Sequence, residues 1–139
     1  MRRASLNGRR LSVVALLLLA TGCEDELNDP QIESCDETLE IEVAEAPATI
    51  NYLVAADGNA VVNSVTYTTS AGEQTVNSFA GNSCEEGIVF CEQVMFDEPV
   101  NATLRARGEV ATGGQIGITY TVTFEDAMPI VGPITLCGA

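Results

Sequence analysis

The sequence predicts an all-β protein, an immunoglobulin-like sandwich of two sheets with about seven to eight antiparallel strands. From Leu39 onward, apolar residues alternate with polar residues, which is the period of a strand buried on one side. Turn-forming residues recur at the spacing of about 8 to 12 residues that is typical of such sandwiches. Beyond residue 22, no segment has the period of an amphipathic helix.

Four strands are expected in the first half of the domain, at residues 39–43, 50–54, 61–67 and 75–79. In the first of them, Leu39, Ile41 and Val43 alternate with two glutamates. Asp57–Gly58 follows the second strand and predicts a tight hairpin, because both residues tolerate a positive φ. Residues 70–72 are expected to turn the chain between the third and fourth strands.

The second half of the domain contains the clearest pattern. Residues 102–110 and 116–124 each keep a strict alternation, and Gly113–Gly114 lies between them, which predicts a long hairpin. Residues 87–96 (GIVFCEQVMF) are apolar nearly throughout and predict a central strand covered on both sides. A final strand is expected near residues 129–137.

The N-terminus has the layout of a secretory signal. Four arginines within residues 1–10 precede the stretch 11–20, which is apolar apart from Ser12, and small residues follow it. As a helix, that stretch rises only about 15 Å, roughly half of a hydrocarbon core, which is too short for a permanent span. Residues 1–22 are therefore interpreted as a signal peptide that is cut off.

Residues 19–23 (LATGC) resemble the lipobox of bacterial lipoproteins, in which the cysteine thiol receives diacylglycerol and the signal is cut before it. The resemblance implies that Cys23 carries acyl chains such as palmitate and holds the protein on a membrane surface of the cell envelope, at its periplasmic or extracellular face. Ala20 stands where the family more often has Leu. An ordinary signal with a chance cysteine near its end is the alternative.

Removal of the signal leaves 117 of the 139 residues, which is enough for one domain. Two arginines then face 20 acidic residues, a net charge of −18, which excludes binding to nucleic acid and to anionic lipid surfaces. Seven carboxylates lie within residues 24–37, which predicts a solvated tether, with calcium binding as an alternative. The expected organisation is a signal (1–22), a lipidated tether (23–37) and a β-sandwich (38–139).

Four cysteines remain besides Cys23, and an even number in an oxidising compartment predicts two disulfides. An even number of strands returns the chain to the end where it began, so Cys35 and Cys137 are expected to pair. Cys84 and Cys91 then close a short loop. Other pairings remain open, as does a zinc site, although the chain has no His and no CxxC pair.

The sequence predicts neither a catalytic site nor a metal or cofactor. A Ser or Thr nucleophile needs a base, and the mature chain contains neither His nor Lys. The adjacent acids Glu85–Glu86 and Asp97–Glu98 lie in turn-like segments, where solvated carboxylates are normal. Asp57-Gly58-Asn59 matches half of a calcium loop but lacks the distal Glu, and a plain turn explains the same residues.

Arg105 and Arg107 are the only positive side chains of the mature protein, and their spacing places them on one face of one strand. Thr119, Thr121 and Thr123 are expected beside them on the returning strand of the long hairpin. Together they predict a flat polar face suited to a protein partner. The alternative is that the arginines neutralise carboxylates on a neighbouring strand.

The stretches NSVTYTTSAGEQTV (from Asn63), VNATLRARGEV, GGQIGITYTVTFED and TLC are similar to the extracytoplasmic domain of the mycobacterial MmpS-type family. The resemblance covers residues 50–137 and implies a small secreted β-sandwich that accompanies an exporter of lipids or siderophores. Two features depart from the family pattern. Its tryptophan-containing segment is replaced here by residues 84–91, and its cysteine after the long hairpin would fall at Tyr120.

The expected function is therefore that of a membrane-anchored extracytoplasmic lipoprotein, a non-enzymatic binding or accessory module with a protein partner. A structural or adhesive surface component without a discrete ligand is the alternative. Composition does not separate the two.

Overall fold

A computed structural model describes residues 31–82 and 84–138, which contain nine strands. No helix among these residues is long and apolar enough to cross a membrane. The expected signal peptide, Cys23 and residues 24–30 of the expected tether lie outside the described residues.

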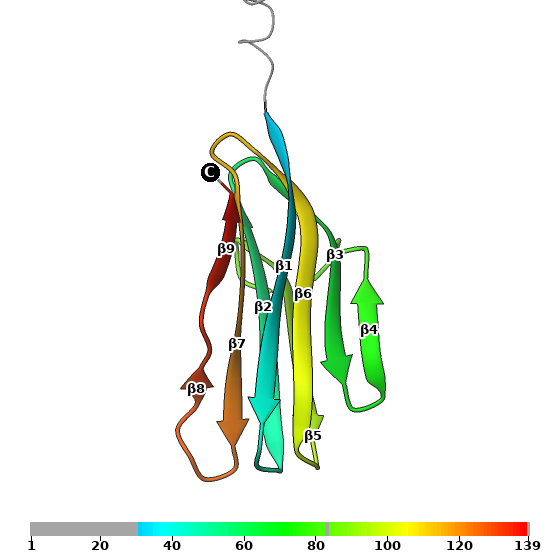
Figure 1. The fold of residues 1–139 in the computed structure, drawn as a ribbon, viewed down its shortest axis with the longest axis vertical. Coiled ribbons are helices and arrows are strands. Elements are labelled where there is room, and N and C mark those ends of the chain that lie inside the picture. Colours follow the sequence, from blue (N-terminus) through cyan, green and yellow to red (C-terminus); the bar gives the residue numbers. More distant parts are fainter. Residues whose placement is uncertain (1–30, 83, 139) are drawn as a thin grey trace, which may run out of the picture. The chain divides into compact units, whose positions relative to one another are not determined.

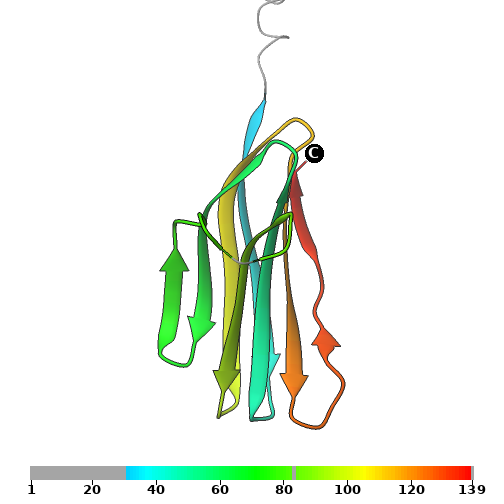
Figure 2. The same ribbon diagram turned by 180° about the vertical axis from the view of Figure 1, so that it is seen from behind.

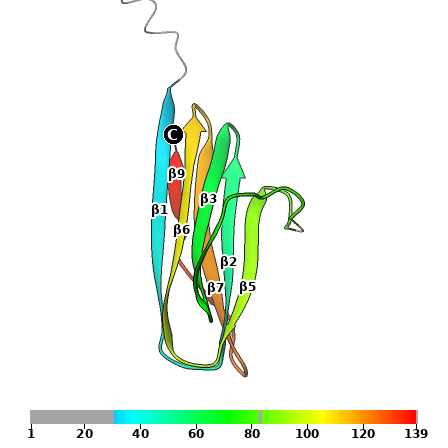
Figure 3. The ribbon, with the colours of Figure 1, turned by 90° about the vertical axis from the view of Figure 1, so that its right-hand side faces the viewer.

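The strands form two antiparallel sheets packed face to face, which confirms the predicted sandwich (Figures 1 and 2). The four-stranded sheet has the order β1 (Ile32–Val43), β6 (Val100–Ala111), β3 (Ala60–Thr69) and β4 (Gly72–Val76). The five-stranded sheet has the order β5 (Ile88–Phe96), β2 (Ala48–Asp57), β7 (Gln115–Phe124) and then β8 (Ile130–Val131), with β9 (Thr135–Gly138) also paired to β7. Figure 3 gives a side view of the strands.

The core lies between the sheets and is built from the inward row of each strand. Alternate residues of β2 are buried, and Ile50, Tyr52 and Val54 are fully covered. They face Leu104 of β6 and the other inward side chains of the opposite sheet. Each aliphatic side chain buried in this way contributes about 1.5–3 kcal/mol, so the period-2 pattern accounts for most of the packing.

Tyrosines link the two layers within the core. The Tyr52 hydroxyl on β2 donates a hydrogen bond of 2.8 Å to the carbonyl oxygen of Thr68 on β3. Its ring meets that of Tyr67 edge to face, with centroids 5.5 Å apart. The ring centroid of Tyr67 in turn lies 5.0 Å from the ring centroid of Phe90 on β5. The buried phenol is thus satisfied by the opposite sheet, as a polar group in a core requires.

The expected long hairpin is wrong, because β6 and β7 belong to different sheets. The tight hairpin expected at Asp57–Gly58 is also wrong, because β2 and β3 belong to different sheets. Each of the two turns carries the chain across the sandwich as an arch, and the arches pack on one another. The Ala111 amide donates to the Asn59 carbonyl at 2.8 Å, and the Asn59 side chain donates to the Thr112 carbonyl at 3.2 Å. A local turn signal predicts reversal of the chain but not pairing of the flanking strands.

Glycines make this close approach of the arches feasible. Gly58 and Gly113 both have positive φ, at 62° and 82°. A Cβ on Gly58 would also collide with the Gly113 carbonyl. The turn at residues 70–72 is a true hairpin as expected, since β3 and β4 pair directly.

The boundary expected at residue 38 is also wrong. β1 begins at Ile32 and pairs with β6 along its whole length, from Ile32–Ala111 to Val43–Val100. Residues 32–37 are therefore part of the sandwich and not of a tether. Within residues 32–37 the buried side chain is Cys35, while its neighbours Ser34 and Asp36 face solvent.

Two further strands differ from expectation. β5 is an edge strand paired only with β2, and it is not a central strand covered on both sides. Its apolar appearance comes partly from Cys91, which is engaged in a disulfide. The expected final strand is divided into β8 and β9, and Gly132–Pro133 lies in the gap between them. Proline interrupts the ladder because it has no amide proton.

Both expected disulfides are confirmed. Cys35 of β1 bonds Cys137 of β9, so the bridge joins the two sheets across 102 residues of sequence. Cys84 bonds Cys91 of β5 and closes a loop with a separation of seven residues. The first bridge joins one edge strand of each sheet, which closes this side of the sandwich covalently.

Candidate interaction faces

Arg105 and Arg107 point outward from the four-stranded sheet, and both contact Asp36 of the neighbouring strand β1. Arg105 donates two hydrogen bonds to this carboxylate, from Nε to Oδ1 at 2.7 Å and from Nη2 to Oδ2 at 2.6 Å. The Nε atom of Arg107 lies 3.4 Å from Oδ2. The arginines therefore neutralise a cross-strand carboxylate, which was the alternative drawn from the sequence.

The neutralisation is incomplete. The hydrogen bond from Arg105 holds the pKa of Asp36 below its usual value, and Asp36 raises the pKa of Arg105. Two guanidinium groups thus share the Asp36 carboxylate, so this three-residue cluster has a local charge of +1 on a face that also carries Glu40, Glu42, Glu73 and Glu109. The guanidinium of Arg105 makes two hydrogen bonds to Asp36, whereas the side chain of Arg107 is 55% exposed. Arg107 is the group that can receive an anion from outside.

Hydroxyl groups surround this cluster on the four-stranded sheet. The hydroxyls of Thr66 and Thr75 are hydrogen-bonded at 2.9 Å across β3 and β4. The Thr103 hydroxyl donates to a Glu73 carboxylate oxygen at 3.3 Å, and the Thr103 amide donates to the Thr68 hydroxyl at 2.9 Å. These bonds order the side chains into a flat polar surface.

The predicted face is split by the two-sheet arrangement. Thr119, Thr121 and Thr123 lie on β7 and point outward from the five-stranded sheet. Because Arg105 and Arg107 project from the other sheet, the core separates the two groups. The five residues therefore do not form one surface, and the error follows from the wrong hairpin.

The threonines instead belong to what we call the uncharged face. It consists of outward-pointing strand residues of the five-stranded sheet that carry no charge: Thr49, Asn51, Leu53, Ala55, Cys91, Gln93, Met95, Thr119, Thr121, Thr123, Val131 and Leu136. Among the described residues, the charged strand residue that points the same way is Asp57, at the very end of β2. Its carboxylate accepts a hydrogen bond from the Gly58 amide at 2.8 Å.

Exposed apolar side chains flank the uncharged face on both edges. Met95 lies on the β5 edge and is 66% exposed. Val131 and Leu136 lie on the opposite edge, in β8 and β9, and are 73% and 56% exposed. Grouped exposed apolar residues are typical of interaction surfaces. Sequence reasoning missed Val131 and Leu136 because a single final strand was expected near residues 129–137 and no face was assigned to its residues.

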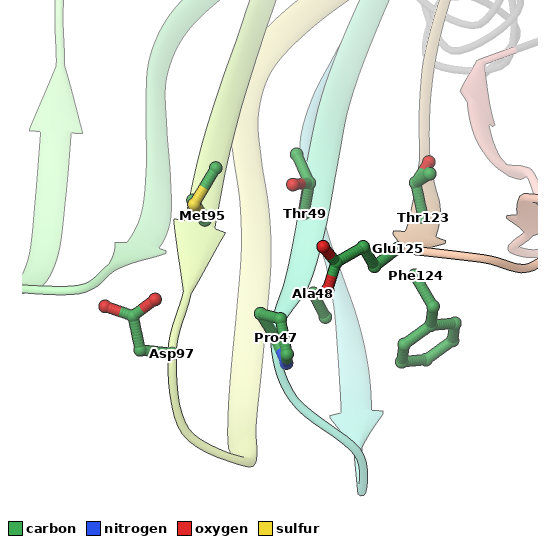
Figure 4. Close-up of a pocket in the computed structure, with 8 residues that line it drawn as sticks. All are labelled: Pro47, Ala48, Thr49, Met95, Asp97, Thr123, Phe124 and Glu125. Atoms are coloured by element: carbon green, nitrogen blue, oxygen red, sulfur yellow. The ribbon is translucent and has the colours of Figure 1, made fainter.

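An open pocket of about 430 Å³ lies at one end of the uncharged face (Figure 4). Thr49, Met95 and Thr123 of that face contribute to its lining. Asp97 and Glu125 stand on either side of Pro47 in this view. Their carboxylates suit a cationic side chain better than a metal ion, since no group of three or more potential protein ligands for a metal occurs in the described chain.

The half calcium loop is used for structure. Asp57 caps the arch through the Gly58 amide, and the Asn59 side chain bonds the neighbouring arch. The turn interpretation therefore accounts for both residues.

Comparison of the chain with protein-family models, with curated proteins and with solved structures finds no match.

Proposed function

We propose that this protein is a non-enzymatic binding or accessory module, held at an extracytoplasmic membrane surface by a lipid on Cys23. The signal-like N-terminus and the LATGC sequence support the anchor. The two disulfides fit a non-reducing compartment outside the cytoplasm. The proposed partner is a protein, and the resemblance to MmpS-type domains suggests an export complex as the setting.

A single observation carries the binding role: two arginines share Asp36, so that Arg107 retains an exposed guanidinium on a flat surface. In a mature chain of net charge −18, this is the place where an acidic side chain of a partner is attracted. A guanidinium binds a carboxylate through two charge-assisted hydrogen bonds, which gives orientation as well as affinity. A flat polar sheet surface suits a protein better than a small molecule, which needs a concave apolar pocket.

The test is crosslinking in native membranes, followed by affinity purification of wild type and of Arg107→Glu. We expect the variant to lose the partner and to remain folded, with a small fall in its thermal midpoint because the new Glu lies opposite Asp36 on the exposed face. Glu40→Gln is the matched control, since Glu40 lies on β1 of the same sheet and should not affect partner capture. A folded Arg107→Glu variant that still captures the partner would show that this surface is not the interface.

The same purification separates the two functional classes. A binding module yields a stoichiometric partner from wild type, whereas a structural or adhesive component yields none. The anchor is tested separately by Cys23→Ala, which should block signal processing or release soluble protein. A variant that stays in the membrane fraction with the mobility of wild type would contradict the lipid anchor.

A further inference from the structure

Charge is distributed very unevenly between the two outer faces of the sandwich. The face of the four-stranded sheet carries five carboxylates besides the two arginines, at Asp36, Glu40, Glu42, Glu73 and Glu109. The uncharged face has none along β7 and β9, in a chain whose mature form contains 20 acidic residues. We propose that two copies of this chain pair through the uncharged face, with a twofold axis near Thr121.

Twofold symmetry gives a physical reason for the absence of charge. In such an interface the same patch is used by both copies, so a residue close to the axis meets its own counterpart. A carboxylate there would lie opposite an identical carboxylate and would oppose association. Neutral hydroxyls do not have this problem, because a hydroxyl both donates and accepts hydrogen bonds. Thr121 lies between Asn51 of β2 and Val131 of β8, in the middle of such a neutral row.

Pairing through the uncharged face also keeps the repulsion between two strongly acidic chains small. Sheets stack about 10 Å apart, so packing the two five-stranded sheets together places the charged faces roughly 30 Å from each other. That is well beyond the screening length of about 8 Å at physiological ionic strength. Pairing of two copies through the four-stranded sheet would instead bring the carboxylates of the two copies together.

The surroundings of the face limit where the copies meet. The loop that carries Glu85 and Glu86 is tied by the Cys84–Cys91 bond to the outward side of β5, and it projects beyond that strand (Figure 3). The contact must therefore be centred on β2 and β7. There Leu53, Val131 and Leu136 supply apolar area, of which the last two are exposed in the single chain. The arginine cluster remains free on the far side, so this pairing is independent of the proposed partner binding.

A charge-exchange experiment tests the pairing. Native mass spectrometry of the mature lipidated protein, released from detergent, should show a dimer for wild type. Thr121→Glu and Thr121→Lys should each weaken dimerisation roughly tenfold or more, because two like charges then face each other a few ångströms apart. A mixture of the two variants should restore the dimer. Thr66→Glu, a matched threonine on the outer side of the other sheet, should dimerise like wild type.

Several outcomes would overturn the inference: a monomeric wild type, an unchanged Thr121→Glu dimer, or a mixture that does not dimerise. If the charged variants fail to fold, a photo-crosslinking amino acid is placed at position 121 of the full chain and activated in the cell, and the mass of the crosslinked product shows what lies against this face. A product of twice the chain mass supports the dimer, and a product with another protein or with lipid refutes it. Rising salt should strengthen the dimer, since it screens the repulsion between two acidic chains.

Discussion

Arg105 binds Asp36 with both ends of its guanidinium fork, although its direct neighbour on β1 is Thr38. The residue directly opposite Asp36 is Arg107. The ion pair therefore runs diagonally across the β1–β6 ladder, while the closer arginine makes the longer contact of 3.4 Å. This geometry orders Arg105 and leaves Arg107 available, which is why the two arginines have different proposed roles.

The first prediction concerns the titration of Asp36. Its pKa in the folded protein lies below the ordinary value of 3.8, chiefly through the Arg105 hydrogen bond. The associated stabilisation is present above pH 3.8 and is lost as the pH falls through the lower folded value. Arg105→Gln should move the pKa of Asp36 upward, and carboxyl-carbon NMR titration measures it. An unchanged pKa in the variant would show that Arg105 is not the cause.

The second prediction compares the two disulfides. In the chain-entropy model, closing the 102-residue separation stabilises the fold by about 4–5 kcal/mol, against about 2–3 kcal/mol for the short loop. Denaturant unfolding of Cys35→Ser/Cys137→Ser and of Cys84→Ser/Cys91→Ser should therefore give a larger loss for the first pair. Equal losses would mean that loop length does not govern these bridges.

The third prediction concerns Tyr52. Burial raises its pKa well above 10, and burial together with the nearby Glu92 raises the pKa of Tyr67. The neutral phenol is the form that the fold favours, so this contribution to stability is present below about pH 10 and is lost as the pH rises through the folded value. Tyr52→Phe removes the hydrogen bond to Thr68 and should cost about 1 kcal/mol in unfolding free energy. It should also remove a late step from the alkaline absorbance titration; persistence of that step would assign it elsewhere.

The fourth prediction concerns Gly108, which faces the core from β6. An added Cβ would collide with the Val61 carbonyl oxygen and the Ile116 side chain, and a backbone atom cannot shift as cheaply as the end of a flexible side chain. Gly108→Ala should therefore destabilise the protein by about 1–3 kcal/mol in thermal or denaturant unfolding. Gly117→Ala is the control, because its nearest neighbour is the flexible end of Leu136 at 3.0 Å. A loss at Gly117 as large as that at Gly108 would contradict the steric explanation.

The alternation of side chains was predictable from the sequence because burial depends only on the row to which a residue belongs. Leu39, Ile41 and Leu104 are buried, and Arg105 points outward, as their positions indicate. The Cys35–Cys137 pairing was predictable for a related reason: β8 and β9 both run antiparallel to β7, so the nine strands make eight passes and the chain finishes at the end where it began. The alternation is a local property of each strand, and the disulfide pairing follows from an even number of passes along the sandwich.

Pairing between strands could not be predicted in the same way. Gly58 and Gly113 signal a reversal, but an arch between sheets and a hairpin within one sheet use the same alternating flanks. Asp36 was missed because an edge strand with a polar outer row has little hydrophobicity to mark it. The separation of the threonines from the arginines followed from these non-local contacts and therefore became visible only in the fold.

The bond between Cys35 and Cys137 has a mechanical consequence. Tension that reaches the domain from its N-terminal side enters at β1, an edge strand that could otherwise be peeled from β6 one hydrogen bond at a time. Cys35 is the fourth residue of that strand, so peeling stops almost as soon as it starts. Beyond that point the load is shared with β9 and thus with the other sheet. Under oxidising conditions the two sheets should resist the pulling force together. After reduction, β1 should detach from β6 one hydrogen bond at a time.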